Sequence, residues 1–450
     1  TQHDLAENVI EITEALKKFD TFGPVSFTTD PEESARFWSI RSGIFPTVGG
    51  MRRPGTTCLI EDVAFHVEDL AEAVTELSDL LDRHGYDDSC IYGHALEGNF
   101  HFIINQSFDS DLQVQRYKDM INEVGELVVK KYDGSLKAEH GTGRNMAPFV
   151  EFEWGAKAFE VMKRIKLIFD PAGILNPGVI FNDDPQCCFK NFKALPVLTA
   201  APAASKEMEE AFVKINKCIE CGFCEVNCVS CGFTLSSRTR IALQRHITAL
   251  ERSGSDPKLL KELRKQYSYH GEQTCAGDGL CSMSCPMGIN VGDLTHDLRR
   301  RNMGRAGRRT GKFAADHFHG VKTGLRGVLH LAHFGHSVLG SEAMGVVGKG
   351  LHAVGLPLWT PAFPKSYNAS RLSKASAVGA EQALKVVYFP SCLNQTMGTD
   401  KASKGMRPLA EEMTDLLHKA GYEVIFPKRM DHLCCGTIWE SKGLPDIADR

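Results

Sequence analysis

The chain has 450 residues, of which 42% are hydrophobic and 24% charged, a balance typical of ordinary globular proteins with room for about three domains. Its formal net charge of −4 gives no indication of nucleic-acid binding, so we expect no such partner. The sequence contains no apolar window of 18 residues or more, which excludes a transmembrane helix.

Cysteine usage indicates the compartment. Fifteen cysteines in a long chain do not resemble a secreted disulfide scaffold, and most lie at metal-ligand spacings, which favours a reducing compartment. We therefore expect a cytoplasmic location, and peripheral contact with the inner face of a membrane stays open as an alternative. The chain starts at Thr1 without Met and stops at Arg450 inside a repeated-looking element, so we expect a fragment of a longer polypeptide.

Residues 1–185 read as alternating helices and strands, which predicts an α+β domain. An amphipathic helix opens the chain, a strand follows at 57–67, and strand-like runs at 91–104 are broken by a turn at Glu97-Gly98-Asn99. Further helices are expected at 70–81, 117–128 and 159–169, the last stopped by Asp170-Pro171.

The remainder of the chain divides into four segments. Residues 186–209 include a Pro/Ala-rich linker, and residues 210–300 carry cysteine motifs between helical segments. Residues 301–380 predict a helical connector. Residues 381–450 predict the start of an α/β unit, with a buried strand at 386–389, a helix ending at 416–422 and a second strand at 424–426.

One cysteine run is the most informative motif. Cys218, Cys221, Cys224 and Cys228 form C-x2-C-x2-C-x3-C, the ligand run of a bacterial iron–sulfur module in which the fourth cysteine ligates the other cluster. The first cluster would thus take the first three cysteines and the distant Cys285. Structural zinc is the main alternative for such thiols.

The second predicted cluster departs from the usual spacing. It would take Cys228, Cys275 and Cys281, but Asp278 stands where a middle cysteine is expected. Three readings stay open: Asp278 completes the ligand set, the cluster has three irons, or Cys231 supplies the missing thiolate. Asp278 can equally be a turn residue, and Cys231 is more simply a spare thiol.

A second constellation combines His94, His101, Glu139 and His140. The two histidines are seven residues apart, which on one straight strand would place them on opposite faces, but the turn at Gly98-Asn99 can return them to one side. Two imidazoles and a carboxylate suit a divalent metal with open positions. His140 would then be free to act as a general base. Two structural histidines are the alternative.

Other reactive residues carry weaker signals. Cys392 with Cys434-Cys435 can bind a cluster or form a buried thiol group, and Cys187-Cys188 receives no assignment. The histidine-rich stretch is interpreted as structural or interfacial because it lacks regular ligand spacing; it contains His317, His319, His330, His333 and His336.

Three motif groups resemble the C-terminal half of the FAD-linked oxidase family, which includes D-lactate, glycolate and D-2-hydroxyglutarate dehydrogenases. They are the segments 93–101, 137–143 and 169–178. The following order, a two-cluster module and then a cysteine-rich CCG domain, resembles the long bacterial members. The fold implied is a ferredoxin-like α+β domain (1–185), an α-helical 4Fe-4S domain (210–300) and a partial CCG domain (381–450).

The resemblance also implies residue roles. His94, His101 and Glu139 match a divalent metal site, usually zinc-like, and His140 matches the base that takes the hydroxyl proton while hydride passes to flavin. Arg41 matches an arginine that holds the substrate carboxylate; taken alone it would be a surface charge.

The resemblance implies FAD, held mainly by an N-terminal domain that would precede Thr1. Asn176, in the segment that closes the domain, and Asn99 would lie on the cofactor side. Asp278 occurs in similar long members. The CCG pattern would want cysteine where the chain has Trp439, so this sequence departs from the pattern there.

The expected function is oxidation of a small D-2-hydroxy acid, with D-lactate as the first choice. Electrons would pass through two clusters to a quinone or cytochrome partner, and a homo-oligomer is compatible with the chain. One alternative is D-2-hydroxyglutarate, whose second carboxylate would need Arg52, Arg53 or Arg144. Another is an electron-transfer subunit of a glycolate-oxidase-like complex.

Overall fold

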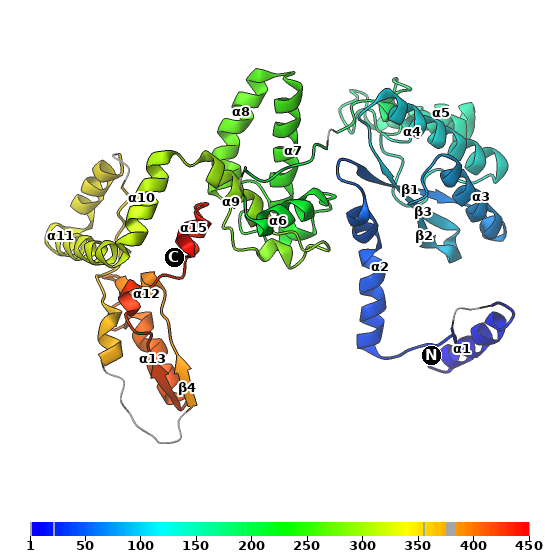
Figure 1. Ribbon diagram of the computed structural model, residues 1–450. Helices are drawn as coiled ribbons and strands as arrows, with labels where there is room; N and C mark the ends of the chain where they lie inside the picture. The colour runs from blue at the N-terminus through cyan, green and yellow to red at the C-terminus, as the bar shows by residue number, and fades with distance from the viewer. Residues whose placement is uncertain are drawn as a thin grey trace. The chain divides into compact units, whose positions relative to one another are not determined.

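A computed structural model describes residues 2–20, 23–193, 195–202, 204–353, 356–374 and 384–449. The chain forms two compact units, Thr1–Leu294 and Thr295–Arg450 (Figure 1). The predicted start of the last domain, residues 381–383, lies outside the described residues.

The first unit contains a three-stranded antiparallel sheet in the order β1-β3-β2. Strand β1 is Thr57–Ala64, β2 is Cys90–His94 and β3 is Asn99–Gln106, so the strands predicted on both sides of the turn are confirmed. Gly98 turns the chain between β2 and β3 with a φ of 67°, a conformation that side-chain-bearing residues rarely adopt.

The core of this domain lies between one face of the sheet and two helices, α3 (Leu70–Arg83) and α4 (Asp111–Gly125). Phe102 and Ile104 alternate along β3 and meet Leu77 of α3 and Met120 of α4 in one buried cluster. The odd-numbered residues of β3, including His101, therefore face the other side of the sheet.

Three more helices complete this part of the unit. Helix α1 is Gln2–Leu16, α2 is Pro31–Met51 and α5 is Val150–Phe169, with a break at Gly155. The carboxylate of Asp30 caps α2 by accepting the Glu32 N–H at 3.0 Å. The predicted helices at 70–81, 117–128 and 159–169 are confirmed, the second continuing as a π-helix over Glu126–Lys131.

The cysteine-rich part is built from short helices joined by loops. They are α6 (Lys206–Asn216), α7 (Ser237–Ser253) and α8 (Pro257–Tyr267). Serine or aspartate side chains cap all three helices, which ends each preceding loop at a defined residue. The cluster cysteines lie in the connection between α6 and α7 and in the segment that follows α8.

The second unit is mostly helical. Helix α9 (Val291–Asn302) runs across the boundary between the units, and α10 (Arg305–Asp316) and α11 (Phe318–Ala353) form the predicted helical connector. Gly340, with a φ of 77°, interrupts α11. No helix within the described ranges has an apolar stretch of the length that a bilayer crossing requires.

The predicted α/β unit is present at the end of the chain. Strand β4 (Leu384–Val387) pairs in parallel with β5 (Tyr422–Ile425), and α13 (Leu409–Lys419) connects them. The prediction of a buried strand at 386–389 is wrong, because Val387 is 66% exposed and Phe389 is 36% exposed. Three of the four residues of β4 are exposed.

The shorter elements lie in the connections. The α-helices are α12 (Cys392–Thr396), α14 (Thr437–Glu440) and α15 (Pro445–Ala448). The 3-10 turns are Val67–Asp69, Ala95–Glu97, Ala147–Phe149, Cys187–Phe189, Phe223–Asn227, Leu280–Ser282, Ala369–Lys374 and Met430–His432, and a second π-helix is Ser268–Gln273.

Candidate functional site

The structure brings His94, His101 and Glu139 together. Glu139 Oε1 lies 3.3 Å from Nε2 of His94 and 3.0 Å from Nε2 of His101. His94 ends β2, His101 lies within β3, and Glu139 comes from the loop that precedes α5. Three ligand atoms from three separate segments thus converge, and all lie within 4.8 Å of one another.

Strand register explains why the two histidines share a face. His94 pairs directly with Asn99 across the β2–β3 hairpin, and Asn99 and His101 are two residues apart on one strand. The turn therefore returns His101 to the side on which His94 lies, as the sequence analysis allowed. Asn99 itself is buried, and its side-chain oxygen makes no hydrogen bond within the described residues.

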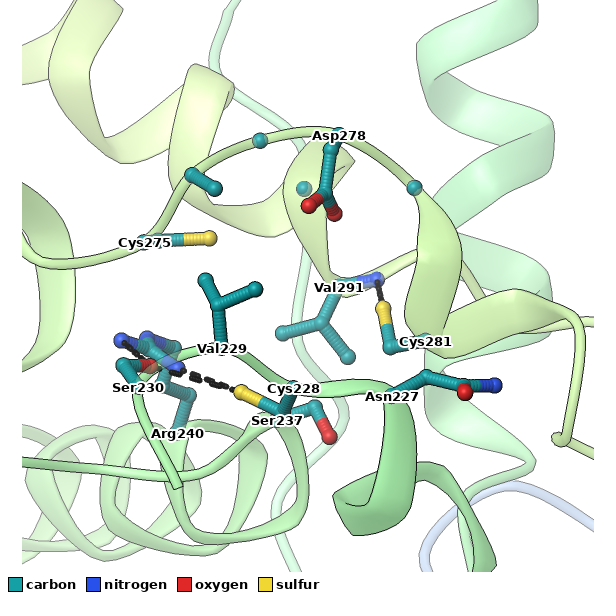
Figure 2. Close-up of a pocket in the computed structure, with 14 residues that line it drawn as sticks. Asn227, Cys228, Val229, Ser230, Ser237, Arg240, Cys275, Asp278, Cys281 and Val291 are labelled. Atoms are coloured by element: carbon teal, nitrogen blue, oxygen red, sulfur yellow. Dashed lines mark hydrogen bonds between the residues drawn. The ribbon is translucent and has the colours of Figure 1, made fainter. Parts of the chain in front are cut away.

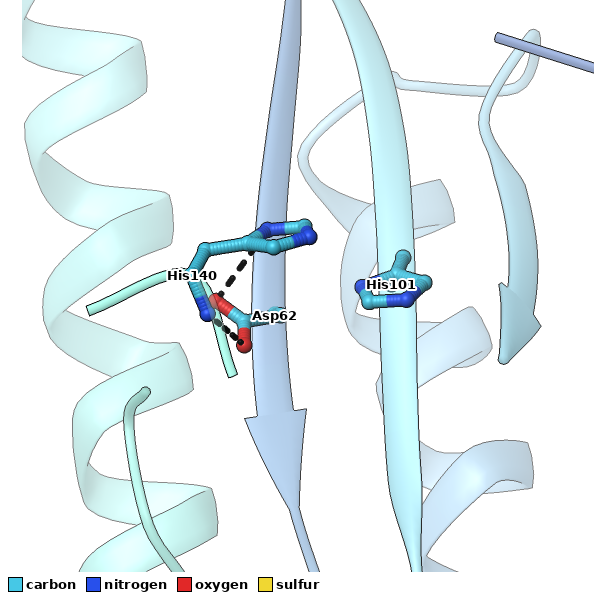
Figure 3. A group of neighbouring side chains, drawn as sticks. All are labelled: Asp62, His101 and His140. Atoms are coloured by element: carbon cyan, nitrogen blue, oxygen red, sulfur yellow. Dashed lines mark hydrogen bonds and ion pairs between the residues drawn. The ribbon is translucent and has the colours of Figure 1, made fainter. Parts of the chain in front are cut away.

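Asp62 holds the loop that carries Glu139, and sequence reasoning did not identify it. This fully buried carboxylate accepts backbone N–H groups from Ala138 at 3.0 Å, Glu139 at 2.7 Å and His140 at 3.1 Å. Figure 3 shows its contacts with His140. Burial alone would raise the pKa of Asp62, but the N–H groups of Glu139 and His140, with Lys137 and the His140 ring, lower it overall.

A sequence signal for Asp62 does exist. Glu61 and Asp62 are adjacent acids in the strand Thr57–Ala64, and buried carboxylates require dedicated partners. Glu61, also buried, forms an ion pair with Lys137 and accepts a hydrogen bond from Asn145. Two adjacent acids within a strand therefore indicate a polar site in the sequence.

His140 lies beside the three converging groups. Its ring stacks on that of His101 with centroids 4.6 Å apart and planes within 8° (Figure 3). Nδ1 of His140 is 3.5 Å from Asp62 Oδ1, and Nε2 is 3.7 Å from Glu139 Oε1. Burial, and next the neighbouring His140, lower the pKa of His101, so His101 is neutral and free to donate an electron pair at neutral pH.

Arg41 reaches the same group from helix α2. Its Nη2 lies 3.1 Å from Nε2 of His94, and its side chain is exposed. Asn176 is placed differently: it sits in an exposed turn with a φ of 46°, where its carbonyl accepts the Val179 N–H. Backbone contact between Ile180 and Gly143 ties this turn to the loop after His140.

The first set of predicted cluster cysteines lines one cavity. Cys218, Cys221, Cys224 and Cys285 border this cavity, together with Pro46 of α2. The backbone N–H of Glu220 donates to Cys218 Sγ at 3.4 Å. Burial raises the pKa of the Cys218 thiol to about 11, so a bound metal would be needed to keep it as a thiolate.

The second set lines a separate cavity. Cys228, Cys275, Cys281 and Asp278 all border it, and Figure 2 shows the Asp278 carboxylate turned toward this space. Asp278 Oδ1 also accepts the Leu280 N–H at 3.1 Å, as a turn residue would. Cys231 is exposed and is not among the lining residues, which favours its reading as a spare thiol.

The crossed cysteine arrangement is therefore what the fold produces. Cys228 leaves its own run for the second cavity, and Cys285 leaves its run for the first. Converging thiols, N–H groups directed at sulfur, and mostly apolar walls fit iron–sulfur clusters at both places.

The second unit holds further clustered donors. Cys392 lies close enough to Cys434 and Cys435 that, after burial, their charges raise the pKa of its thiol. His319 Nδ1 lies 2.8 Å from Asp431 Oδ2, and the His319 ring stacks on His432. The thiols of the predicted CCG segment, Cys392, Cys434 and Cys435, are thus neighbours. His319 belongs to the histidine-rich stretch.

Comparisons with known proteins identify the two parts of the first unit. Residues 1–180 match the family described as FAD linked oxidases, C-terminal domain. Residues 214–289, which contain all the cysteines of both cavities, match the 4Fe-4S dicluster domain. These matches support the predicted FAD and iron–sulfur clusters as cofactors, and they favour clusters over structural zinc.

Relatives among characterised proteins agree with this assignment. The chain is 29% identical over 185 residues to "Glycolate oxidase subunit GlcD" of Bacillus subtilis (41% of this chain, 38% of the relative). It is 33% identical over 165 residues to "D-lactate dehydrogenase [cytochrome], mitochondrial" of Arabidopsis thaliana (36% and 28%). It is 29% identical over 153 residues to "D-2-hydroxyglutarate dehydrogenase" of Stutzerimonas stutzeri (33% and 32%).

The chain spans between about a quarter and two-fifths of the length of these relatives. Proteins named for three different hydroxy-acid activities match this chain at similar identity, so the similarity supports a family and no single substrate. The predicted resemblance and fold class are confirmed: this chain carries the C-terminal domain of the FAD-linked oxidases, joined to a 4Fe-4S dicluster domain.

Proposed function

We propose that the complete protein oxidises a D-2-hydroxy acid, with D-lactate as the first candidate, to the corresponding 2-oxo acid. The reaction removes two electrons and two protons from the carbinol group. The observation that carries the proposal is the convergence of His94, His101 and Glu139 within 4.8 Å, beside Arg41 and His140.

A divalent metal of the zinc class would be held by His94, His101 and Glu139, since two neutral imidazoles and one carboxylate leave positions open for a substrate. The fit rests on Glu139 Oε1, which faces both Nε2 atoms. Arg41 would pair with the substrate carboxylate, since its guanidinium offers planar donors next to His94.

His140 would accept the hydroxyl proton at Nε2. Its Nδ1 faces Asp62, so the ring that gains a proton is stabilised by a buried carboxylate at 3.5 Å. When bound, FAD supplies the hydride acceptor and the clusters supply single-electron transfer to a quinone or cytochrome partner. Asn99 and Asn176 would contribute on the cofactor side.

D-2-hydroxyglutarate is the second candidate substrate. Its additional carboxylate needs another cation, and Arg52 is unsuitable because it is buried and bonded to backbone carbonyls. Arg144 donates to the Pro177 carbonyl, and Arg53 is exposed. These two arginines are the candidates for that carboxylate.

A non-catalytic electron-transfer subunit is the remaining alternative, and the name of the Bacillus relative, a glycolate oxidase subunit, keeps it in view. The presence of the His94, His101 and Glu139 group in the same unit as the cysteine cavities supports a catalytic role.

The test compares substrates on the full-length protein, purified with FAD under anaerobic conditions. D-lactate, L-lactate, glycolate and D-2-hydroxyglutarate are offered with an artificial electron acceptor, and kcat/KM is measured for each. Highest kcat/KM with D-lactate supports the first candidate, and a preference for D-2-hydroxyglutarate supports the second. Loaded protein that oxidises none of them would support the subunit alternative.

A further inference from the structure

All three buried arginines among the described residues lie beside the two cysteine cavities. Arg52, Arg240 and Arg245 are 4%, 1% and 3% exposed. Burying a guanidinium is costly unless an anion compensates its charge. Their common position therefore raises the question of which negative charges compensate these three guanidinium groups.

Two of these arginines donate hydrogen bonds to the same loop beside the first cavity. Arg52 donates to the carbonyls of Lys217 at 2.7 Å and Cys218 at 2.8 Å. Arg245 donates to the same Cys218 carbonyl at 3.0 Å, and both arginines reach the Asn216 carbonyl. Two cations thus converge on the backbone of one cluster cysteine.

The third arginine contacts the second cavity directly. Arg240 Nη1 lies 3.6 Å from Cys228 Sγ as a donor, and Nη2 donates to Ser230 at 2.9 Å (Figure 2). Nη2 also donates to Thr274 at 3.1 Å. Its Nε donates to the Gly271 carbonyl at 2.7 Å. Arg240 is one of the residues that line this cavity.

Protein carboxylates compensate only part of this charge. Glu220 accepts from Arg245 at 2.9 Å. Within the part of the chain that the structure describes, Arg52 and Arg240 form hydrogen bonds to carbonyl, hydroxyl and thiol groups and to no carboxylate. A thiolate-ligated cluster is an anion, and one in each cavity would supply the missing charge.

We propose that Arg52, Arg240 and Arg245 are the counter-cations of the two clusters and raise their reduction potentials, Arg52 and Arg245 at the first cluster and Arg240 at the second. The inference rests on the redox role proposed above. Each cluster gains one electron on reduction, with no bond made or broken, and so becomes more negative by one charge. A fixed cation at short range in a poorly hydrated site stabilises the reduced form more than the oxidised form.

The test is a redox titration of the full-length protein followed by EPR. R240Q is expected to lower the midpoint potential of the second cluster with little effect on the first, and R52Q and R245Q to do the reverse. R238Q is the matched control: Arg238 borders the first cavity, but its side chain is 40% exposed and paired with Glu225, so its removal should shift neither potential appreciably.

Charge-preserving variants separate the effect of charge from that of the hydrogen bonds. R52K and R240K keep a cation but lose several hydrogen-bond donors. Cluster-loaded R52K and R240K should therefore have midpoint potentials nearer to wild type than those of R52Q and R240Q. If R52Q fails to load clusters, R52K is titrated in its place. A fall in the midpoint potential of the first cluster in R52K as large as that in loaded R245Q would contradict the charge account. Unchanged potentials in loaded R240Q and R245Q would overturn the inference.

Failure of the proposed function looks different. Wild-type protein without iron and acid-labile sulfide would show that the clusters are absent. Wild-type protein with intact clusters that oxidises no hydroxy acid would exclude the catalytic role. Neither result resembles loaded variants whose potentials do not move.

Discussion

The carboxylate of Asp62 contacts His140 twice. Oδ2 accepts the backbone N–H of His140 at 3.1 Å, and Oδ1 lies 3.5 Å from ring Nδ1. Asp62 also holds Glu139 through its backbone N–H at 2.7 Å. One buried side chain on β1 therefore positions both a proposed metal ligand and the proposed base, although it lies about 75 residues earlier in the chain.

Substitution of Asp62 by asparagine should weaken both functions. Asparagine keeps one oxygen acceptor but loses the negative charge that faces His140 and Lys137. We expect a loss of about 10- to 100-fold in metal affinity or activity, as is usual for residues that orient ligands. Zinc content after dialysis and kcat should both fall, whereas unchanged values would show that the backbone alone fixes the loop.

Substitution of His140 by glutamine should stop proton transfer while leaving the metal bound. Removing a general base costs on the order of 10²- to 10⁴-fold in rate. The measurement is kcat together with metal content in the FAD-loaded full-length protein. H66Q is the control, since His66 is exposed and outside the group around Glu139. Turnover in H140Q equal to that in H66Q would refute the base assignment.

The proposed role of Asp278 as a ligand of the second cluster can be tested by iron content. If its carboxylate completes the ligand set, anaerobic wild-type protein should contain about eight irons per chain, and D278A about seven with a three-iron EPR signal. D278C should retain the full iron content. C231S should behave as wild type, because Cys231 does not border the cavity. Iron loss in C231S instead would make Cys231 a ligand.

Gly98 should tolerate no side chain. It adopts a φ of 67°, and a Cβ there would lie 2.1 Å from the backbone oxygen of Phe65. We expect G98A to cost about 1–3 kcal/mol of stability and to displace the hairpin that carries His94 and His101, with loss of metal affinity. Denaturation followed by circular dichroism gives the stability.

The matched control is G43A on helix α2. Gly43 has helical geometry, and a Cβ there would lie 3.9 Å from Thr47 Oγ1. Alanine in a helix is favoured over glycine by roughly 0.5–1 kcal/mol, so G43A should be neutral or stabilising. Equal effects of the two substitutions would show that Gly98 is not under a special constraint.

Asp170 should make the first unit sensitive to acid. The hydrogen bond from Lys166 at 2.6 Å chiefly lowers the pKa of Asp170; burial opposes this, and the N–H groups of Leu175 and Ile174 add to the lowering. Since the folded pKa lies below the unfolded value of about 3.9, the stabilisation is present above that pH and is lost as pH falls through the folded pKa.

D170N should therefore melt at a lower temperature than wild type at pH 7, and the difference should shrink as the pH is brought below about 3.9. Thermal midpoints measured across this range give the comparison. A difference that stays constant with pH would mean that the side-chain charge is not responsible.

Local patterns in the sequence predicted much of this structure. The Glu97-Gly98-Asn99 turn fixed the hairpin, and the spacing of Cys218 to Cys228 with Cys285 anticipated which thiols share a cavity. These features succeed because the determinants lie within a few residues or in a recurrent ligand pattern.

Contacts between distant segments could not be predicted in the same way. Asp62 reaches a loop near residue 139, and Arg52 reaches residues 216–218. The adjacent acids Glu61 and Asp62 indicate a polar site, but local spacing names neither the loop that Asp62 holds nor the carbonyls that Arg52 contacts. The burial of β4 was misjudged for a related reason, since an apolar strand is buried only if another element covers it.

Helix α2 meets the proposed substrate site through Arg41 and the first cysteine cavity through Pro46. These positions are five residues apart, a rise of roughly 7.5 Å along a helix axis. One helix therefore carries a residue of the proposed substrate site and a residue that lines the first cysteine cavity. A movement of α2 as a body would change both places together.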